Sequence, residues 1–388
     1  MKQVNNRVTA TILSMSLLTV MAGAAIAPAL GIIKEYFAAA PHLLLQLIVS
    51  LPALFIIMTN LCFLPISRRW GSRTIAITGL VLYVVAGVGC YWADNIWLLL
   101  ALRALLGVSV GLIMPLSTGL LALYFPPEEQ ARLMGLSAAM NQMGGVVATL
   151  LAGLLAQVEW RCAFLVYLLG LLALVLVLCY LPDERLGSSN KRGRPFEPRQ
   201  LLKFHPSVVG MLLLMLIFFV FPTNFAIIAA QQSSLTPTAV TAIMVGLDVV
   251  AFLAGLMFGW LMNKLPRYMK YAAPLLFLLG YVCYVEGSVP MLLAGSALIG
   301  LANGFGVPYL LTIASIKGGQ NSTTTVMPLL SAALYLGQFA SPLVVLPLSR
   351  LLFGGTVVAP YEVAILFSLI FLVQVWATRC FQSLPPRT

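Results

Sequence analysis

Charged residues are scarce in this chain of 388 residues, and their scarcity excludes most classes of protein. Only 9% of the residues are charged and 61% are hydrophobic, whereas about 25% are charged in a typical soluble domain. No hydrophilic stretch is long enough to form a domain outside a membrane. The formal net charge is +11, but the basic residues lie in short segments between apolar stretches. We therefore expect no nucleic-acid binding.

The sequence also lacks the motifs of common cofactor and catalytic sites. The phosphate-binding patterns GxGxxG and GxxxxGK[ST] are absent, which argues against ATP-driven pumping by this chain. Its two histidines, His42 and His205, are predicted on opposite sides of the membrane, and its six cysteines form no CxxC pair. We expect no metal, no cofactor and no enzymatic activity, and we interpret the cysteines as small buried hydrophobic residues.

What the chain has instead is long apolar segments. A helix of about 20 apolar residues crosses a bilayer, and charge-free stretches of that length predict twelve membrane-spanning helices. Alternating strands of a membrane barrel are absent from the pattern. The expected fold class is therefore an all-α membrane protein, with spans near residues 8–30, 43–65, 74–93, 96–123, 133–156, 163–181, 207–229, 238–262, 271–288, 290–315, 323–348 and 360–379.

The basic residues predict the orientation of these spans. If the N-terminus lies in the cytoplasm, only Lys34, Arg161 and Arg350 fall outside, and cytoplasmic loops normally carry the excess of Lys and Arg. We therefore predict a multi-pass protein of the plasma (inner) membrane with both termini cytoplasmic. Residues 22–27 resemble a signal-peptide cleavage site, but the apolar run reaches Gly31, so we expect an uncleaved first helix.

The two halves of the chain repeat in the same order. Residues 107–115 and 300–308 both read Gly-x3-Gly-x3-Pro, residues 136–139 recur as 330–333, and Gly144 recurs as Gly337. A direct repeat predicts two pseudo-symmetric six-helix bundles, residues 1–182 and 207–388, joined by a basic cytoplasmic linker at 183–206. We interpret the repeated residues as sites of close helix packing or bending: Gly107, Gly111, Pro115, Gly144, Gly300, Gly304 and Pro308.

The loop after the second span carries a family resemblance. In Ile66-Ser67-Arg68-Arg69-Trp70-Gly71-Ser72-Arg73, the residues Arg69, Gly71 and Arg73 match the Gly-x-Leu-x-Asp-Arg-x-Gly-Arg-Arg/Lys pattern of the major facilitator superfamily, although Arg68 stands at its acidic position. The second half has a partial copy at residues 259–267. The resemblance implies a cytoplasmic gate, and a Gly permits a tight reversal between spans. A purely topogenic basic loop is the alternative. The gate residues are Arg68, Arg69, Gly71, Arg73, Asn263 and Lys264.

Two further segments resemble the drug:proton antiporter branch of that family. Arg103-Ala104-Leu105-Leu106-Gly107 is similar to an Arg-x-x-x-Gly motif tied to proton coupling, and the small residues of 144–153 are similar to the span-five motif, with Thr149 in place of its Pro. Arg103 lies about 10 Å below the outer end of its span at 1.5 Å per residue. A buried guanidinium needs partners. The alternative is a side chain that reaches up to the outer headgroups.

Few other polar residues are predicted at membrane depth. Asp248 is the only carboxylate near the centre of a span, and we predict that it couples transport to protons together with Arg103. The resemblance implies that Asn141, Gln142 and Asp248 meet at an interface between the halves. Each amide has an alternative role as a hydrogen bond between helices. The predicted substrate cavity is lined by Met21, Met114, Asn141, Gln142, Asn224, Phe225, Asn303, Tyr309, Tyr335 and Gln338.

These observations predict a secondary transporter that works by alternating access. The apolar lining, together with the resemblance, favours proton-coupled efflux of small amphipathic or hydrophobic compounds. Proton-coupled uptake of a small metabolite is the alternative, and a membrane enzyme or a non-transporting receptor is a distant one. The expected partners are a small-molecule substrate, protons and the lipid bilayer, and we expect a monomer.

Overall fold

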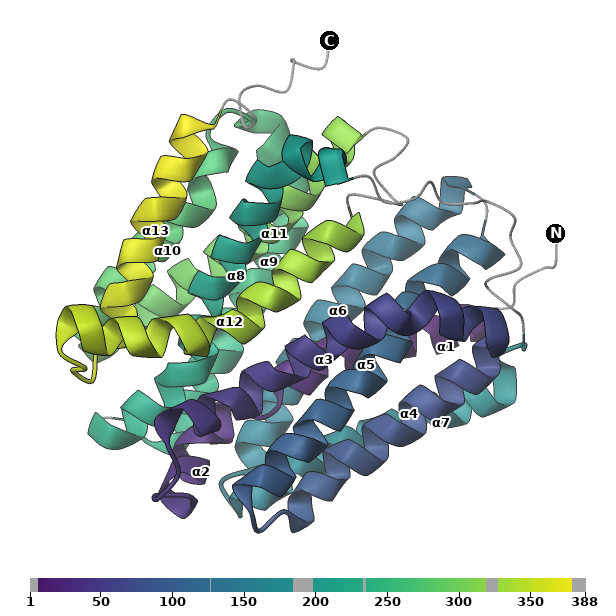
Figure 1. The fold of residues 1–388 in the computed structure, drawn as a ribbon, viewed down its shortest axis with the longest axis horizontal. Helices are drawn as coiled ribbons and strands as arrows, with labels where there is room; N and C mark the ends of the chain where they lie inside the picture. The colour runs from purple at the N-terminus through teal and green to yellow at the C-terminus, as the bar shows by residue number, and fades with distance from the viewer. Residues whose placement is uncertain (1–5, 126, 184–197, 233–234, 319–326, 379–388) are drawn as a thin grey trace. The chain divides into compact units, whose positions relative to one another are not determined.

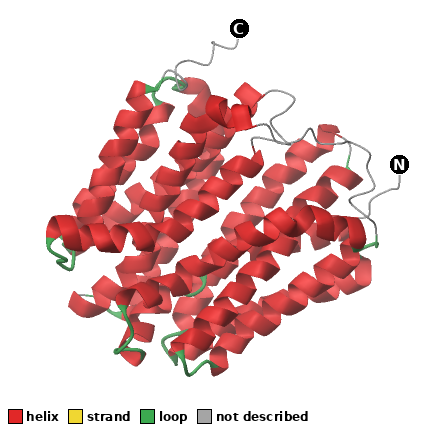
Figure 2. Ribbon diagram, in the orientation of Figure 1, coloured by secondary structure: helices red, strands yellow, loops and turns green. Residues whose placement is uncertain are grey.

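The computed structural model describes residues 6–125, 127–183, 198–232, 235–318 and 327–378, and these residues form helices and loops without a strand (Figure 2). The chain divides into two compact units, residues 1–191 with 229–241 and residues 192–228 with 242–388. Helices are expected here because lipid offers the backbone no hydrogen-bond partners, so each span must satisfy its own N–H and C=O groups.

The first unit contains the helices of the first six predicted spans (Figure 1). The first span is broken into α1, a short 3-10 helix η1 and α2, and the sixth begins as the 3-10 helix η3. In order, the elements are α1 (Asn6–Ala24), η1 (Ala27–Ala29), α2 (Leu30–Tyr36), α3 (His42–Arg69), α4 (Ser72–Gly89), η2 (Cys90–Trp92), α5 (Ile96–Tyr124), α6 (Pro127–Leu155), η3 (Trp160–Leu168) and α7 (Leu169–Tyr180).

The remaining six spans are single helices, as predicted. They are α8 (Pro198–Gln232), α9 (Pro237–Lys264), α10 (Met269–Glu286), α11 (Val289–Gly318), α12 (Met327–Phe353) and α13 (Ala359–Ala377). In the described part of the chain, eleven helical segments are long and apolar enough to cross a membrane. The helix outside that set is α10, which has 18 residues with Lys270 and Glu286 near its ends. Residues 184–197 of the predicted linker lie outside the described residues, and 198–206 belong to α8.

The repeated Gly-x3-Gly segments make matching contacts inside the two units. In the first unit, a Cβ on Gly107 of α5 would lie 2.9 Å from Cβ of Phe55 on α3. In the second, a Cβ on Gly300 of α11 would lie 2.6 Å from the carbonyl oxygen of Leu247 on α9. Real Cβ atoms do not approach other atoms so closely, so the absence of a side chain is what allows each pair of backbones to meet.

The next helix pair repeats the same arrangement. Gly144 of α6 lies against the carbonyl of Leu17 on α1, and a Cβ on Gly337 of α12 would lie 2.6 Å from the carbonyl oxygen of Leu212 on α8. Equivalent helices therefore pack through equivalent glycines in both halves. Figure 1 shows further neighbours within each unit, with α4 beside α7 and α10 beside α13.

Large apolar side chains remain exposed on the outer helix faces. On α7, for example, Leu172 and Val175 are exposed, which fits a surface that meets lipid tails. Cys62 and Cys179 are exposed as well, so the prediction that the cysteines are buried is wrong for these two. The physical reason is that a small apolar side chain has no need of burial in protein where the solvent is itself apolar.

Candidate functional site

Arg103 is the most enclosed charged residue that the structure describes. Its side chain lies on α5 with none of its surface exposed. The guanidinium donates three hydrogen bonds, from Nε to the Ile48 carbonyl at 2.7 Å, from Nη2 to the Ala22 carbonyl at 2.6 Å and from Nη1 to the Tyr167 hydroxyl at 2.6 Å. The alternative prediction that this side chain reaches the outer headgroups is therefore wrong, because its donors are all turned to groups inside the bundle.

The two carbonyls that accept from Arg103 have lost their usual helical donors. In an α-helix the carbonyl of Ile48 would accept from the N–H of residue 52, but residue 52 is Pro52, inside α3, and proline has no N–H. The carbonyl of Ala22 lies in the last turn of α1, which ends at Ala24, where carbonyls lack partners within the helix. Arg103 thus donates to two backbone carbonyls that have no hydrogen-bond donor within their own helices.

Tyr167 completes this site and was missed from the sequence. Its hydroxyl accepts from Arg103 and donates to the Ala22 carbonyl at 3.2 Å. Its ring packs edge-on against Tyr83, with centroids 5.5 Å apart, and Tyr83 in turn donates to the carbonyl of Leu18 at 3.3 Å. A Cβ on Gly87 would collide with the Tyr167 ring. The sequence signal for this site was Pro52, because a proline within a membrane helix leaves the carbonyl one turn earlier without its helical donor.

The second unit fills the equivalent position differently. The repeat that pairs Gly107 with Gly300 also pairs Arg103 with Ser296. Ser296 forms a hydrogen bond with the Tyr284 hydroxyl, and Tyr281 donates to the carbonyl of Ile217 at 2.6 Å. Stacked and edge-on rings occupy the surrounding volume, namely Phe221, Phe225, Phe277, Tyr281, Tyr284 and Tyr361. The charged site belongs to the first unit alone among the described residues.

The predicted gate loop contacts a carboxylate from a distant part of the chain. Asp183, just after α7, accepts a hydrogen bond from the backbone N–H of Arg73 at 3.2 Å. The Ser72 hydroxyl donates to the Pro182 carbonyl at 3.1 Å, and the Arg73 guanidinium donates to the carbonyl of Leu178. A negative side chain at the first turn of α4 is favourable because the helix N-terminus is positive. An acidic side chain therefore contacts the predicted gate loop, although Arg68 stands at the acidic position of the motif itself.

Gly71 serves this loop through its size rather than its backbone freedom. Only two residues join α3 to α4, so the chain does reverse tightly here, but the φ of −69° and ψ of 156° at Gly71 are open to any residue and do not require the backbone freedom of glycine. A Cβ at this position would overlap the Asp183 carboxylate. Arg68 and Arg69 are exposed at the end of α3. In the second half, Asn263 and Lys264 are exposed on the last turn of α9, with the Lys264 ammonium 4.4 Å from the Trp260 ring centroid.

The predicted cavity residues fall into two groups by burial. Met21, Asn224, Phe225 and Tyr309 are buried, whereas Met114, Asn141, Gln142, Asn303, Tyr335 and Gln338 are half-buried. Asn224 donates to the carbonyl of Val220 at 2.9 Å. The buried Oδ1 of Asn303 has no hydrogen-bond partner among the described residues. Their role in lining a cavity stays a prediction.

Asn141 is used between two helices of the first unit. Its Oδ1 accepts from the hydroxyl of Thr19 at 2.8 Å, one turn from a contact of 2.7 Å between the hydroxyls of Ser16 and Ser137. This contact between α1 and α6 fits the alternative role of an amide that joins helices. Asp248, half-buried, lies on α9 in the second unit, so the predicted meeting of these residues across the halves stays a prediction.

Comparison with known families now identifies the kind of protein. The sequence profile of the Major Facilitator Superfamily matches residues 12–342. The chain belongs to this superfamily. The apolar helices of the described residues have the multi-pass, all-helical fold of that superfamily, as predicted.

Individual members of the superfamily resemble the chain to different extents. Quinolone resistance protein NorA of Staphylococcus aureus (strain MSSA476) is 25% identical over 259 residues, which are 65% of this chain and 63% of NorA. The chain spans less than two thirds of the length of the curated relatives it matches. Among solved structures, an inward-facing and unoccupied bacterial homologue of the human lysosomal transporter Spinster has a TM-score of 0.76 at 15% identity, covering 98% of both chains.

A second solved structure of similar fold is that of a symporter. The D-xylose-proton symporter has a TM-score of 0.72 at 16% identity, and the match covers 94% of this chain and 97% of the symporter. At such low identities these likenesses establish the fold of the superfamily and leave substrate and direction to other arguments.

Proposed function

We propose that this superfamily transporter exports small amphipathic or hydrophobic compounds in exchange for protons. The observation that carries the proposal is the similarity to NorA, whose name records quinolone resistance, over 259 residues. The solved structures support a transporter fold and do not distinguish export from uptake, because their identities are 15% and 16%.

Asp248 is the group to which we assign proton binding. Among the described carboxylates it alone lies more than ten residues from both ends of its helix, about 17 Å from the start of α9 at 1.5 Å per residue. Placing a charged carboxylate at that depth costs free energy, so the fraction that is protonated depends on how polar its surroundings are. Such a group changes charge when the cavity opens to a different side.

Arg103 has a different role in this proposal. A guanidinium stays protonated in proteins, so Arg103 is a fixed positive charge and does not carry the proton itself. Its three hydrogen bonds hold that charge between α1, α3 and η3. We assign it the task of keeping the broken first helix in the arrangement from which transport proceeds.

The remaining features of the proposal concern selectivity and placement. Half-buried Met114, Gln142 and Tyr335 combine apolar surface with a few polar atoms, a combination that suits amphipathic compounds of varied shape. We place the protein as a monomer in the plasma membrane with both termini in the cytoplasm. The loop of Arg68, Arg69 and Arg73 serves there as part of the cytoplasmic gate.

Proteoliposomes with an imposed pH gradient test the function directly. The purified full chain is assayed for transport of a quinolone, a lipophilic cation and a panel of small metabolites. Movement of the quinolone or cation in the direction opposite to the flow of protons supports export by exchange. Movement of a metabolite together with protons, with no drug transport, would instead establish uptake and overturn the proposal.

Two carboxylate variants then test the assignment of Asp248. Asp248→Asn keeps the shape of the side chain but cannot titrate, so it should abolish accumulation driven by the pH gradient while leaving substrate binding within about twofold. Glu286→Gln is the matched control, because Glu286 is exposed at the end of α10, and it should transport normally. Undiminished driven transport by Asp248→Asn would rule out this role.

A further inference from the structure

We propose that Tyr167 is a positioning residue that sets Arg103 for transport, and that the 3-10 helix η3 keeps Tyr167 in place. This inference rests on the proposed function, in which Arg103 supplies a fixed charge. It adds a residue on a different span, 64 positions along the chain from Arg103, and a segment of unusual geometry to the transport machinery.

The Tyr167 hydroxyl joins the guanidinium to the broken first helix. It accepts from Arg103 at 2.6 Å and donates to the same Ala22 carbonyl that Arg103 contacts at 2.6 Å. The three groups therefore form a closed triangle of hydrogen bonds without exposed surface on either side chain. A hydrogen bond to a charged group shifts an equilibrium by roughly tenfold or more, so loss of this hydroxyl releases one side of the guanidinium.

The geometry of η3 determines where Tyr167 points. This 3-10 helix runs for nine residues, although such helices rarely exceed three or four. With three residues per turn, Arg161, Phe164 and Tyr167 lie on one face. In an α-helix of about 100° per residue, Tyr167 would turn by about 120° relative to Arg161 and leave Arg103. The length of the 3-10 segment is thus matched to the contact at its end.

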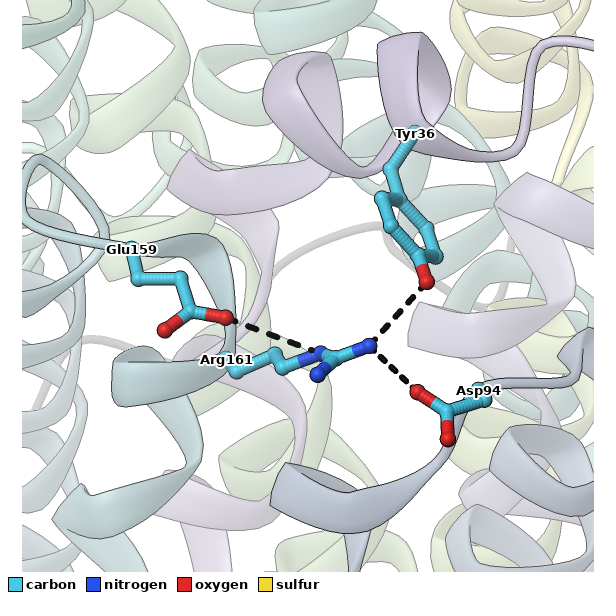
Figure 3. Close-up of polar contacts among 4 residues, drawn as sticks. All are labelled: Tyr36, Asp94, Glu159 and Arg161. Atoms are coloured by element: carbon cyan, nitrogen blue, oxygen red, sulfur yellow. Dashed lines mark hydrogen bonds and ion pairs between the residues drawn. The ribbon is translucent and has the colours of Figure 1, made fainter.

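The other end of η3 is fixed by a charged cluster, which we call the outer cluster and define as Tyr36, Asp94, Glu159 and Arg161 (Figure 3). Arg161 donates to the Tyr36 hydroxyl at 3.0 Å, pairs with the carboxylate of Asp94, and lies 3.7 Å from that of Glu159. The guanidinium also lies 5.4 Å from the Tyr36 ring centroid. These partners come from α2 and from the loops before α5 and η3, so the cluster holds the first turn of η3 in register.

The second unit supplies an internal comparison for this arrangement. The offset of 194 that pairs residues 136–139 with 330–333 also pairs Tyr167 with Tyr361, whereas Arg103 and Ser296 correspond at the offset of 193. The Tyr361 hydroxyl is buried and has no hydrogen-bond partner among the described residues. Tyr361 belongs to an all-helical segment, the first turn of α13. The tyrosine is thus shared by both units, whereas the contact with a guanidinium and the 3-10 helix occur together in the first.

Removal of one hydroxyl from each unit tests the inference. Tyr167→Phe keeps the ring that packs on Tyr83 and removes the contact with Arg103, and Tyr361→Phe is the matched control. In proteoliposomes we expect Tyr167→Phe to lower quinolone transport driven by the pH gradient roughly tenfold and to change its dependence on internal pH. Quinolone binding without a gradient should stay within about twofold, and Tyr361→Phe should match the unaltered chain in every assay.

A second variant approaches the same element from its other end. Arg161→Gln breaks the outer cluster and leaves the Tyr167 hydroxyl intact. It should reduce driven transport in the same direction, and it should add little in a Tyr167→Phe background, because both changes release the same contact. Fully additive effects of the two variants would overturn the role assigned to η3.

The outcomes separate this inference from the proposed function. If the unaltered chain shows no transport driven by a pH gradient, the proposed function fails and so does the inference that depends on it. If the unaltered chain transports and Tyr167→Phe has the same rate and the same pH profile, the inference alone is wrong. A loss of thermal stability with an unchanged pH profile would also contradict it, since that is what a merely structural tyrosine produces.

Discussion

Replacement of Arg103 by glutamine gives the most direct check on the reasoning about its site. Arg103→Gln removes the charge and leaves a shorter amide that cannot reach all three acceptors. The carbonyl of Ile48 then has no donor, because the residue one turn later is Pro52. The carbonyl of Ala22 keeps a donor in the Tyr167 hydroxyl, which lies 3.2 Å away. The two acceptors should therefore contribute unequally.

The expected cost follows from these two carbonyls. An orphaned buried acceptor costs about 1–3 kcal/mol, and loss of the better of two donors costs about 0.5–1.5 kcal/mol. Removal of a buried charge offsets part of this, since burial of a guanidinium is itself unfavourable. We expect a net destabilisation of about 2 kcal/mol, well above the average of about 0.6 kcal/mol for a hydrogen bond between membrane helices.

A double-mutant cycle with Pro52→Ala separates the Ile48 contribution from the rest. Alanine at this position restores an N–H one turn after Ile48, so the carbonyl regains a helical donor and Arg103→Gln should cost about 1 kcal/mol less in that background. The free energy of unfolding is measured in mixed micelles by tryptophan fluorescence, with each single variant as a control. A coupling energy below about 0.3 kcal/mol would refute the claim that Arg103 replaces the donor lost at Pro52.

Three further predictions concern packing, the gate loop and topology. Gly300→Ala should destabilise the second unit by about 1–3 kcal/mol in the same assay, because its Cβ would lie 2.6 Å from the Leu247 carbonyl oxygen, whereas Gly246→Ala, with no atom within 4 Å of its Cβ, should be neutral or slightly stabilising; equal effects would contradict the packing argument. Asp183→Asn should lower the free energy of unfolding by about 0.3–1 kcal/mol at low ionic strength. It should also raise thiol-reagent labelling of a cysteine introduced on the cytoplasmic side. A variant indistinguishable from the unaltered chain at low salt would contradict the role of Asp183 at α4. Cysteines introduced at positions 190 and 386 of a cysteine-free background should resist an impermeant thiol reagent in intact cells, and labelling of either from outside would reverse the orientation.

The sequence alone was sufficient to locate the membrane-spanning segments of this protein, although not the break in the first span or the 3-10 start of the sixth. Bilayer thickness sets the length of a span, and in lipid the backbone N–H and C=O groups must bond to one another. Charge-free stretches of about 20 residues therefore predict helices. Within the described residues, each of the twelve predicted spans coincides with a helical segment, residues 323–326 of the eleventh span lying outside them. The largest shift in boundary occurs where polar residues continue a helix, as at Pro198 in α8. The chain repeat likewise predicted which glycines would correspond between the halves.

The sequence also placed Arg103 at a depth where it requires partners, but it did not say which ones. Those partners lie 55, 64 and 81 positions away along the chain. A buried charge implies that acceptors exist, and Pro52 implies a carbonyl without a helical donor. Whether these two groups meet depends on the rotation of α5 about its axis relative to α3.

Only the tertiary structure decided that rotation, and the physical reason is the solvent. In water, hydrophobic periodicity shows which face of a helix turns inward. In lipid, the face toward the tails and the face toward the protein are both apolar, so the pattern of hydrophobic residues carries little information about neighbours. The approach of Asp183 to Arg73 across 110 positions and the nine-residue 3-10 turn that brings Tyr167 to Arg103 therefore emerge from packing, where small residues and free backbone groups determine the fit.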